Sequence, residues 1–122
     1  METRHRVVVG NARDIALPDD SVELVVTSPP YPMIEMWDDA FAAQSSAVAE
    51  ALDAGDGERA YEAMHAVLDE VWAELERVLV DGGIACVNVG DATRTVGDSF
   101  RVYPNHARVL SAFASLGFDP LP

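Results

Sequence analysis

A long amphipathic helix between two apolar strands constrains the fold more than any other feature of the sequence. Apolar residues recur every three or four positions from Glu58 to Val80, which predicts a helix with one buried face. Asp81-Gly82-Gly83 is expected to end this helix, because glycine tolerates the left-handed conformation found at helix C-termini. The flanking apolar segments Val22–Val26 and Ile84–Val89 predict buried strands, the first of them central in its sheet. Strand, helix and strand in this order predict a right-handed parallel crossover in an α/β fold.

The remaining elements are predicted from shorter signals. A strand is expected at Val7–Val9, where Gly10-Asn11 follows as a turn, and a loop is expected from Asp91 to Tyr103. A helix is expected from Pro104 to Gly117, a strand from Phe118, and a helical region with a break at 53–57 in the segment 38–57. At 122 residues the chain has the size of one domain.

Composition adds expectations about the environment. The 21 acidic residues outnumber 8 basic ones, all of them arginine, and the net charge of −13 opposes nonspecific DNA binding. A strongly acidic chain with clear apolar periodicity predicts adaptation to a salt-rich cytoplasm, where screening weakens phosphate contacts in any case. The N-terminus has no secretory signal pattern and no apolar run is long enough to span a bilayer. Cys86, the single cysteine, is expected in the core, and neither a disulfide nor a cysteine metal cluster is expected.

The segment Ser28-Pro29-Pro30-Tyr31 carries the chemistry. It follows an apolar strand directly, at the end where open parallel sheets bind their ligands. Consecutive prolines remove two N–H donors and fix the backbone, so the carbonyls around them remain as rigid acceptors. Ser28 and the Pro29 carbonyl could hold both hydrogens of an exocyclic amine, and Tyr31 could stack on a base turned out of its duplex.

Thr27-Ser28-Pro29-Pro30-Tyr31 resembles the signature of amino-methylating DNA methyltransferases in which the catalytic motif precedes the cofactor motif. The resemblance extends through most of the chain, and it rests on the following segments: Val9-Gly10-Asn11-Ala12, Leu17-Pro18-Asp19-Asp20-Ser21-Val22, Leu79-Val80-Asp81-Gly82-Gly83 and Asn88-Val89-Gly90-Asp91-Ala92. It implies an S-adenosylmethionine-dependent methyltransferase fold, a doubly wound and mostly parallel sheet, with double-stranded DNA as the substrate in a restriction-modification system. Ser28, Pro29, Pro30 and Tyr31 are the implied catalytic residues.

The resemblance also bears on the target base and the cofactor. Serine at the first motif position is commoner in enzymes that make N4-methylcytosine, whereas aspartate is commoner in N6-adenine methylators, so Ser28 favours cytosine and leaves adenine as the alternative. Where this family usually has Gly-Asp as a contact to the cofactor adenine, the sequence has Gly10-Asn11. Asn11 and Ser28 are the implied cofactor-binding residues, although Asn11 could equally only shape its turn.

Other polar residues allow two interpretations. Arg94 and Arg101 could contact DNA phosphates or could form local salt bridges in a solvated loop. Trp37 could belong to a lid over the flipped base or could pack in the interior. Asn105-His106 is expected to be a helix cap and a surface residue, and Asp69, Glu70, Glu74 and Glu76 are expected on the solvated face of the long helix.

The family's Gly-rich Phe-x-Gly-x-Gly turn, the acid for the cofactor ribose and the DNA-reading region are absent from residues 1–122. The sequence is therefore expected to be one catalytic-half domain, an incomplete sheet that ends before those regions. Two hypotheses follow. The chain could be active with a second chain that carries the cofactor-binding half, or it could be a non-enzymatic remnant.

The first prediction concerns salt. Because a net charge of −13 repels itself, folding should improve as the salt concentration rises from low to molar values. Circular dichroism of the chain should report more helix at high salt. Spectra that are identical across this range would contradict the prediction of salt adaptation.

Overall fold

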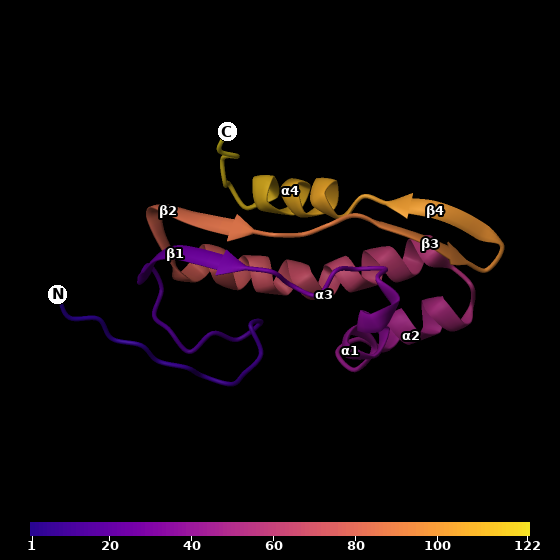
Figure 1. Cartoon of the computed structure of the whole chain (residues 1–122), viewed down its shortest axis with the longest axis horizontal. Coiled ribbons are helices and arrows are strands. Elements are labelled where there is room, and N and C mark those ends of the chain that lie inside the picture. Colours follow the sequence, from indigo (N-terminus) through magenta and orange to yellow (C-terminus); the bar gives the residue numbers. More distant parts are fainter.

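The computed structural model describes residues 1–122 (Figure 1). Its central element is the helix α3 (Gly57–Val78), which confirms the predicted helix. The Asp56 carboxylate caps it by accepting a hydrogen bond from the Arg59 backbone N–H. The buried face of α3 follows the predicted periodicity and consists of Ala60, Met64, His65, Val67, Leu68, Trp72, Leu75 and Val78.

The strand β1 (Val22–Thr27) pairs in parallel with β2 (Leu79–Val87), so the predicted parallel crossover through α3 is confirmed. The expected glycine stop of the helix is wrong. The backbone is already extended at Leu79, and β2 starts there without a loop. Gly82 has a φ of 79° and lies within β2, where the register shifts from Val22↔Leu79 to Leu24↔Ile84. Its left-handed conformation therefore serves a strand irregularity and not a helix end.

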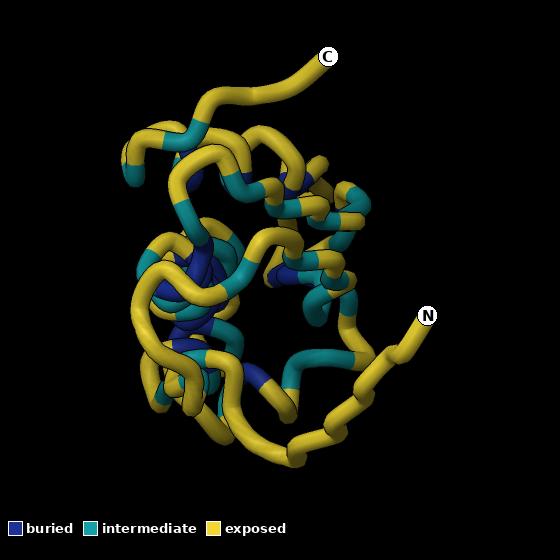
Figure 2. Tube along the Cα trace, turned by 90° about the vertical axis from the view of Figure 1, so that its left-hand side faces the viewer, coloured by how far each residue is buried: buried dark blue, intermediate teal, exposed yellow.

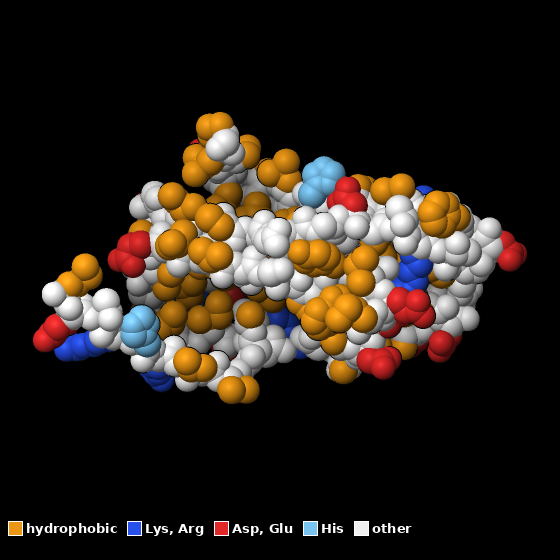
Figure 3. Space-filling view, viewed as in Figure 1, with side chains coloured by type: hydrophobic (Ala, Val, Ile, Leu, Met, Phe, Trp, Pro, Cys, Tyr) orange, Lys and Arg blue, Asp and Glu red, His pale blue; other side chains and the backbone are white.

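The two-stranded sheet is covered on one face only. Val25, Ala85 and Val87 are partly buried and pack against the core, whereas Leu24, Val26 and Ile84 are 56%, 75% and 42% exposed. Because side chains alternate along a strand, Cys86, which is paired with Val26, is also exposed, and the expected burial of Cys86 is wrong. The predicted burial of both strands is therefore confirmed for one face of the sheet only. The predicted central position of β1 is wrong, because β1 pairs with one strand instead of two. Figure 3 shows apolar side chains gathered over β1 and β2.

The predicted strand at Val7–Val9 is wrong, because these residues have no regular structure and are 65% to 99% exposed. A strand needs a neighbour to satisfy its backbone, and none lies beside this segment. Figure 2 shows the N-terminal segment exposed along its length. The predicted strand from Phe118 is wrong in the same way, since residues 118–122 are not extended in any sheet.

The segment 38–57 is helical with a break, as predicted. It forms α1 (Asp38–Ala42) and α2 (Ser46–Asp53), which follow the short 3-10 helix η1 (Glu35–Trp37), and Gly55 has a φ of 67° at the break. The loop expected from Asp91 to Tyr103 is a hairpin of β3 (Ala92–Val96) and β4 (Ser99–Tyr103). It packs Ala92, Val96 and Tyr103 into the core.

The final helix α4 (Asn105–Ser115) confirms the helix predicted after Pro104. It lies along α3, where Trp72 and Phe113 place their ring centroids 4.9 Å apart. The core therefore consists of α3, the inner face of β1 and β2, the hairpin, and helices α1, α2 and α4. None of the helices is long and apolar enough to cross a membrane.

The segment before β1 is held to α3 by two charged side chains. The Arg77 guanidinium donates hydrogen bonds to the carbonyls of Ile15 and Leu17 and to the Asp19 carboxylate, each at 2.8 Å. Glu74 accepts hydrogen bonds from Arg77 and from the Ile15 backbone N–H at 2.7 Å. The expectation of a purely solvated acidic face is therefore wrong for Glu74, since its side chain is 18% exposed.

These contacts generate a prediction on acid stability. Arg77, and then the Ile15 N–H, hold the pKa of Glu74 at about 2. A depressed folded-state pKa contributes stability that is complete above the ordinary glutamate pKa and is lost as pH falls through the folded pKa. The Glu74→Gln substitution should therefore lower the unfolding free energy at pH 6, and its effect should shrink between about pH 4.5 and pH 2.

Chemical denaturation across this pH range provides the measurement. Glu76→Gln is the matched control, because Glu76 is exposed on the same helix and forms no ion pair. A Glu74→Gln effect that is constant from pH 6 to pH 2, or one that equals the effect of Glu76→Gln, would contradict the prediction.

Candidate active site

The candidate site is built on the loop that leaves β1 at its C-terminal end. Ser28 is exposed there, Pro29, Pro30 and Tyr31 are half-buried, and Pro32 is fully buried. Met33 anchors the inner end of the loop. It is 1% exposed, has a φ of 68° and donates its backbone N–H to the Met64 sulfur at 3.2 Å. A non-glycine residue in the left-handed region is strained, so the core of α3 fixes the direction in which this loop turns.

A second loop leaves β2 at the same edge of the sheet. The Asn88 N–H donates to the Thr27 carbonyl at 2.9 Å, which continues the parallel pairing beyond the two strands. The Tyr31 ring lies close against Gly90, since a Cβ atom at that glycine would be 3.3 Å from Tyr31 Cε2. The absence of a side chain at Gly90 therefore makes room for the ring, and the two loops meet at this contact.

The site presents hydrogen-bond acceptors. The carbonyls of Ser28, Pro29 and Pro30 accept no hydrogen bond from any group of the chain. The Ser28 hydroxyl lies 3.5 Å from the Tyr31 hydroxyl, and either group could donate. Proline cannot donate from its backbone, so the loop offers acceptors and one aromatic face, which suits a ligand that carries an amino group.

The sequence did not predict the buried polar group beneath these loops. Asn105 was expected to cap α4, but it is 0% exposed and its Nδ2 donates to the carbonyls of Pro32 at 2.8 Å and Gly90 at 3.0 Å. Its Oδ1 lies 2.9 Å from Nε2 of His65, which is also fully buried. Burial lowers the pKa of His65, although the hydrogen bond with Asn105 raises it in part. The neutral ring is thereby favoured.

The N-terminus of α4 is instead capped by Asp91. Its carboxylate accepts hydrogen bonds from the His106 backbone N–H at 3.1 Å and from His106 Nδ1 at 2.8 Å. His106 is on the surface, as expected. The hydrogen bond with the His106 side chain, followed by that with its backbone, lowers the pKa of Asp91. The sequence alone does not indicate this cap, because only the fold brings the loop after β2, with Asp91, to the start of α4.

The predicted DNA-contact residues lie in different surroundings. Arg94 forms two hydrogen bonds with Asp38 of α1, at 2.8 and 2.7 Å, and its side chain is 17% exposed. Arg101 is 49% exposed and lies 3.7 Å from Glu58. Trp37 is half-buried and packs against the core. Arg94 is therefore occupied in fastening the hairpin to α1, and Arg101 is the more accessible of the two cations.

The two predicted cofactor residues lie in separate segments. Asn11 is exposed, donates to the Gln44 side chain at 3.0 Å and accepts from the Arg13 backbone N–H. Ser28 is exposed at the sheet edge. Both carry polar groups that fit an adenosine or amino-acid moiety, but the sequence has no glycine-rich turn to hold one. The contact of Asn11 and Ser28 with a cofactor therefore stays a prediction.

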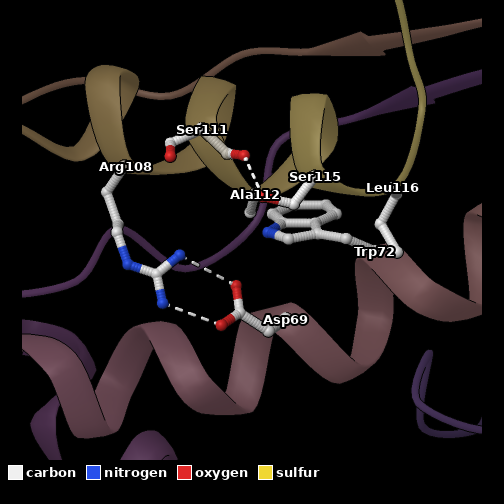
Figure 4. A pocket seen from close by; sticks show the side chains of 7 residues that line it. All are labelled: Asp69, Trp72, Arg108, Ser111, Ala112, Ser115 and Leu116. Carbon is white, nitrogen blue, oxygen red and sulfur yellow. Dashed lines mark hydrogen bonds and ion pairs between the residues drawn. The ribbon is translucent and has the colours of Figure 1, made fainter.

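Two other hollows are lined by residues that lie away from these two loops. An open groove of about 370 Å³ lies between α3 and α4, lined by Asp69, Trp72, Arg108, Ser111, Ala112, Ser115 and Leu116 (Figure 4). Asp69 and Arg108 form a bidentate pair there at 3.1 and 2.8 Å, and the Asp69 side chain is 39% exposed, in agreement with its expected place on the solvated face of the long helix. No cluster of three or more His, Cys, Asp or Glu side chains could hold a metal ion.

Comparison with known proteins places this geometry in a family. Residues 22–119 match the model of the N6/N4 DNA methylase family. The type II methyltransferase M.MthZI of Methanothermobacter thermautotrophicus is 46% identical over the whole chain, and M.MjaI of Methanocaldococcus jannaschii is 45% identical over 98% of it. The chain spans 35% and 44% of the lengths of these two relatives.

Solved structures agree with the sequence comparisons. The crystal structure of a DNA modification methylase from Thermus thermophilus superposes with a TM-score of 0.71 and 36% identity, covering 97% of this chain and 42% of that protein. The same protein complexed with S-adenosyl-L-methionine gives a TM-score of 0.69 and 35% identity. The fold is thus part of the α/β methyltransferase fold, as the sequence predicted, and the chain belongs to the N6/N4 DNA methylase family.

Proposed function

We propose that the chain provides the catalytic loop of an S-adenosylmethionine-dependent DNA methyltransferase that modifies the N4 amine of cytosine. The observation that supports this most directly is the set of free carbonyls at Ser28, Pro29 and Pro30, beside an exposed serine hydroxyl and an aromatic ring. An exocyclic amine has two hydrogens to donate, and the free carbonyls and the serine hydroxyl of this loop can accept them. The base that carries the amine would be turned out of its duplex onto Tyr31.

In this proposal the loop acts by holding the amine in one orientation. The Ser28 Oγ and the Pro29 carbonyl each accept one N–H of the target. These hydrogen bonds draw the nitrogen toward tetrahedral geometry and direct its lone pair away from the loop. Bound S-adenosylmethionine would supply an electrophilic methyl group on that side. Asn11 and Ser28 are the residues of this chain that would contact the cofactor.

The target base is inferred from Ser28 alone. N6-methylation of adenine is the alternative, since an adenine amine offers the same two donors. Digestion of the methylated duplex and chromatography of its nucleosides distinguish the two target bases. We expect N4-methylcytosine. N6-methyladenine as the sole product would show that the target is adenine.

The cofactor-binding half is proposed to cover the bare face of the sheet. Leu24, Val26 and Ile84 form an exposed apolar strip on β1 and β2, in a chain that is otherwise strongly acidic. The relatives and the Thermus structure are more than twice as long as the matched region. The missing half could be a continuation of this chain or a second, cytoplasmic partner chain, and it would bring the glycine-rich turn and the ribose acid.

One prediction tests this division of the cofactor site. The 122-residue chain alone should bind S-adenosylmethionine more weakly than micromolar, because it lacks the glycine-rich turn. Addition of the segment of M.MthZI beyond the matched region should restore binding in titration calorimetry. Micromolar binding by the chain alone would refute the division, and no binding or methyl transfer with any complementing half would favour a non-enzymatic remnant.

A second prediction tests the roles within the loop in the complemented enzyme. Ser28→Ala removes a hydrogen bond that strengthens as the nitrogen becomes tetrahedral, so kcat should fall by roughly 10- to 100-fold with little change in DNA affinity. Tyr31→Ala removes a stacking surface of about 1 to 3 kcal/mol, so both DNA affinity and kcat should fall. Methyl transfer to a cytosine-containing duplex and a DNA-binding titration measure the two effects.

Matched controls keep these results specific to the loop. Tyr31→Phe retains the ring and should bind DNA as the unmodified enzyme does. Ser115→Ala is the control for the loss of a serine hydroxyl outside the loop, because Ser115 is an exposed residue of α4. Wild-type turnover in both Ser28→Ala and Tyr31→Ala would show that this loop is not the active site.

A further inference from the structure

The buried amide of Asn105 connects the two loops of the site. Both of its N–H donors are used, on the carbonyls of Pro32 and Gly90, and its Oδ1 pairs with His65 Nε2. Pro32 directly follows Tyr31, and Gly90 is the residue on which the Tyr31 ring rests. One side chain at the start of α4 therefore binds Gly90 and the residue next to Tyr31, one on each side of the contact between ring and glycine.

The chemistry of the partners fixes the orientation of this amide. Carbonyl oxygens can only accept, so Nδ2 must face Pro32 and Gly90, and Oδ1 must face His65. His65 Nε2 must then carry the proton, which leaves Nδ1 unprotonated and without a partner in the interior. The His65 and Tyr61 rings form a T-shaped pair at a centroid distance of 4.6 Å, and the Tyr61 hydroxyl donates to the Pro104 carbonyl.

We propose that Asn105, oriented by His65, is the positioning residue that holds Tyr31 against Gly90 and so sets the stacking face for the target base. This inference rests on the proposed function for its consequence, because the stacked base belongs to that function. Asn105 does not touch the base. It fixes the distance between the loop that follows β1 and the loop that follows β2. No other side-chain hydrogen bond connects these two loops.

The substitution Asn105→Asp separates positioning from packing. Aspartate has the size of asparagine but has no N–H to donate, so an oxygen would face the carbonyls of Pro32 and Gly90. The loops should separate there, and the ring should leave Gly90. Val109→Ala is the matched control, because Val109 is buried on the same helix and lies outside the network, so its truncation lowers stability through packing alone.

Proton NMR of the chain tests the placement of the ring without requiring activity. In the unmodified chain the Tyr31 ring should shift the Gly90 α-proton resonances, and Tyr31→Ala defines their positions without the ring. Asn105→Asp should move these resonances most of the way to the Tyr31→Ala values, and Val109→Ala should leave them in place. A folded Asn105→Asp chain with unmoved Gly90 resonances would overturn the inference.

His65 provides a second pair of variants should Asn105→Asp not fold. His65→Leu removes the donor to Asn105 Oδ1 and should displace the Gly90 resonances in part. His65→Gln keeps an amide N–H near the position of Nε2 and should restore them. Equal, unshifted resonances in both variants would show that His65 does not orient the amide.

Turnover in the complemented enzyme tests the consequence. Asn105→Asp should lower kcat by roughly 10- to 100-fold while the KM for S-adenosylmethionine stays near its original value, and Val109→Ala should retain kcat wherever it is folded. Equal kcat values in the two variants would overturn the role of Asn105 in positioning. If the unmodified complemented enzyme transfers no methyl group, the proposed function fails, and the Gly90 resonances still decide whether Asn105 places the ring.

Discussion

The parallel pairing of β1 with β2 is the constraint on which the site depends. Parallel strands end at the same edge of a sheet. The pairing therefore brings the loop after Thr27 and the loop after Val87 together, although these two residues lie 60 positions apart in the sequence. The pairing continues one step beyond the strands through Asn88 and Thr27, so the loops start from fixed positions. α3 makes this possible, since it returns the chain along the sheet and buries its apolar face there. The packing of the apolar strands and helix thus brings together polar residues that are far apart in the sequence.

Elements that depend on local pattern and on burial within this chain could be predicted from sequence. β1, α3 and α4 form where the sequence pattern predicted them, and the loop at Ser28–Tyr31 lies at the expected strand end. The surroundings of segments that have no neighbour within this chain could not be predicted. Val7–Val9 has the composition of a buried strand, but no strand lies beside it, and Cys86 lies in an apolar segment whose outer face is bare. Sequence pattern indicates what a segment can bury, and the surroundings decide whether it does.

The hairpin and the Asn105 network were missed for different reasons. The alternation of Ala92 and Val96, followed by Gly97 with a φ of 60°, is a hairpin signal that the intervening polar residues obscured. Asn105 carries no such signal: an asparagine before a helix is usually a cap, and only the fold brings it to His65, 40 positions away. A buried amide can be recognised by its three satisfied hydrogen bonds, which exist only once the loops and helices are in place.

The arginines show how charge is distributed between folding and binding. Arg13, Arg77, Arg94, Arg101 and Arg108 all form ion pairs within the chain, and Arg4, Arg6 and Arg59 form none. Arginine suits this use because its planar group can bind a carboxylate at two points, as Arg94 and Arg108 do with Asp38 and Asp69. A chain with a net charge of −13 and so few free cations has little to offer a phosphate backbone. In the proposed enzyme, the loop would therefore contribute recognition of the flipped base, and backbone contacts would have to come from the half that carries the cofactor.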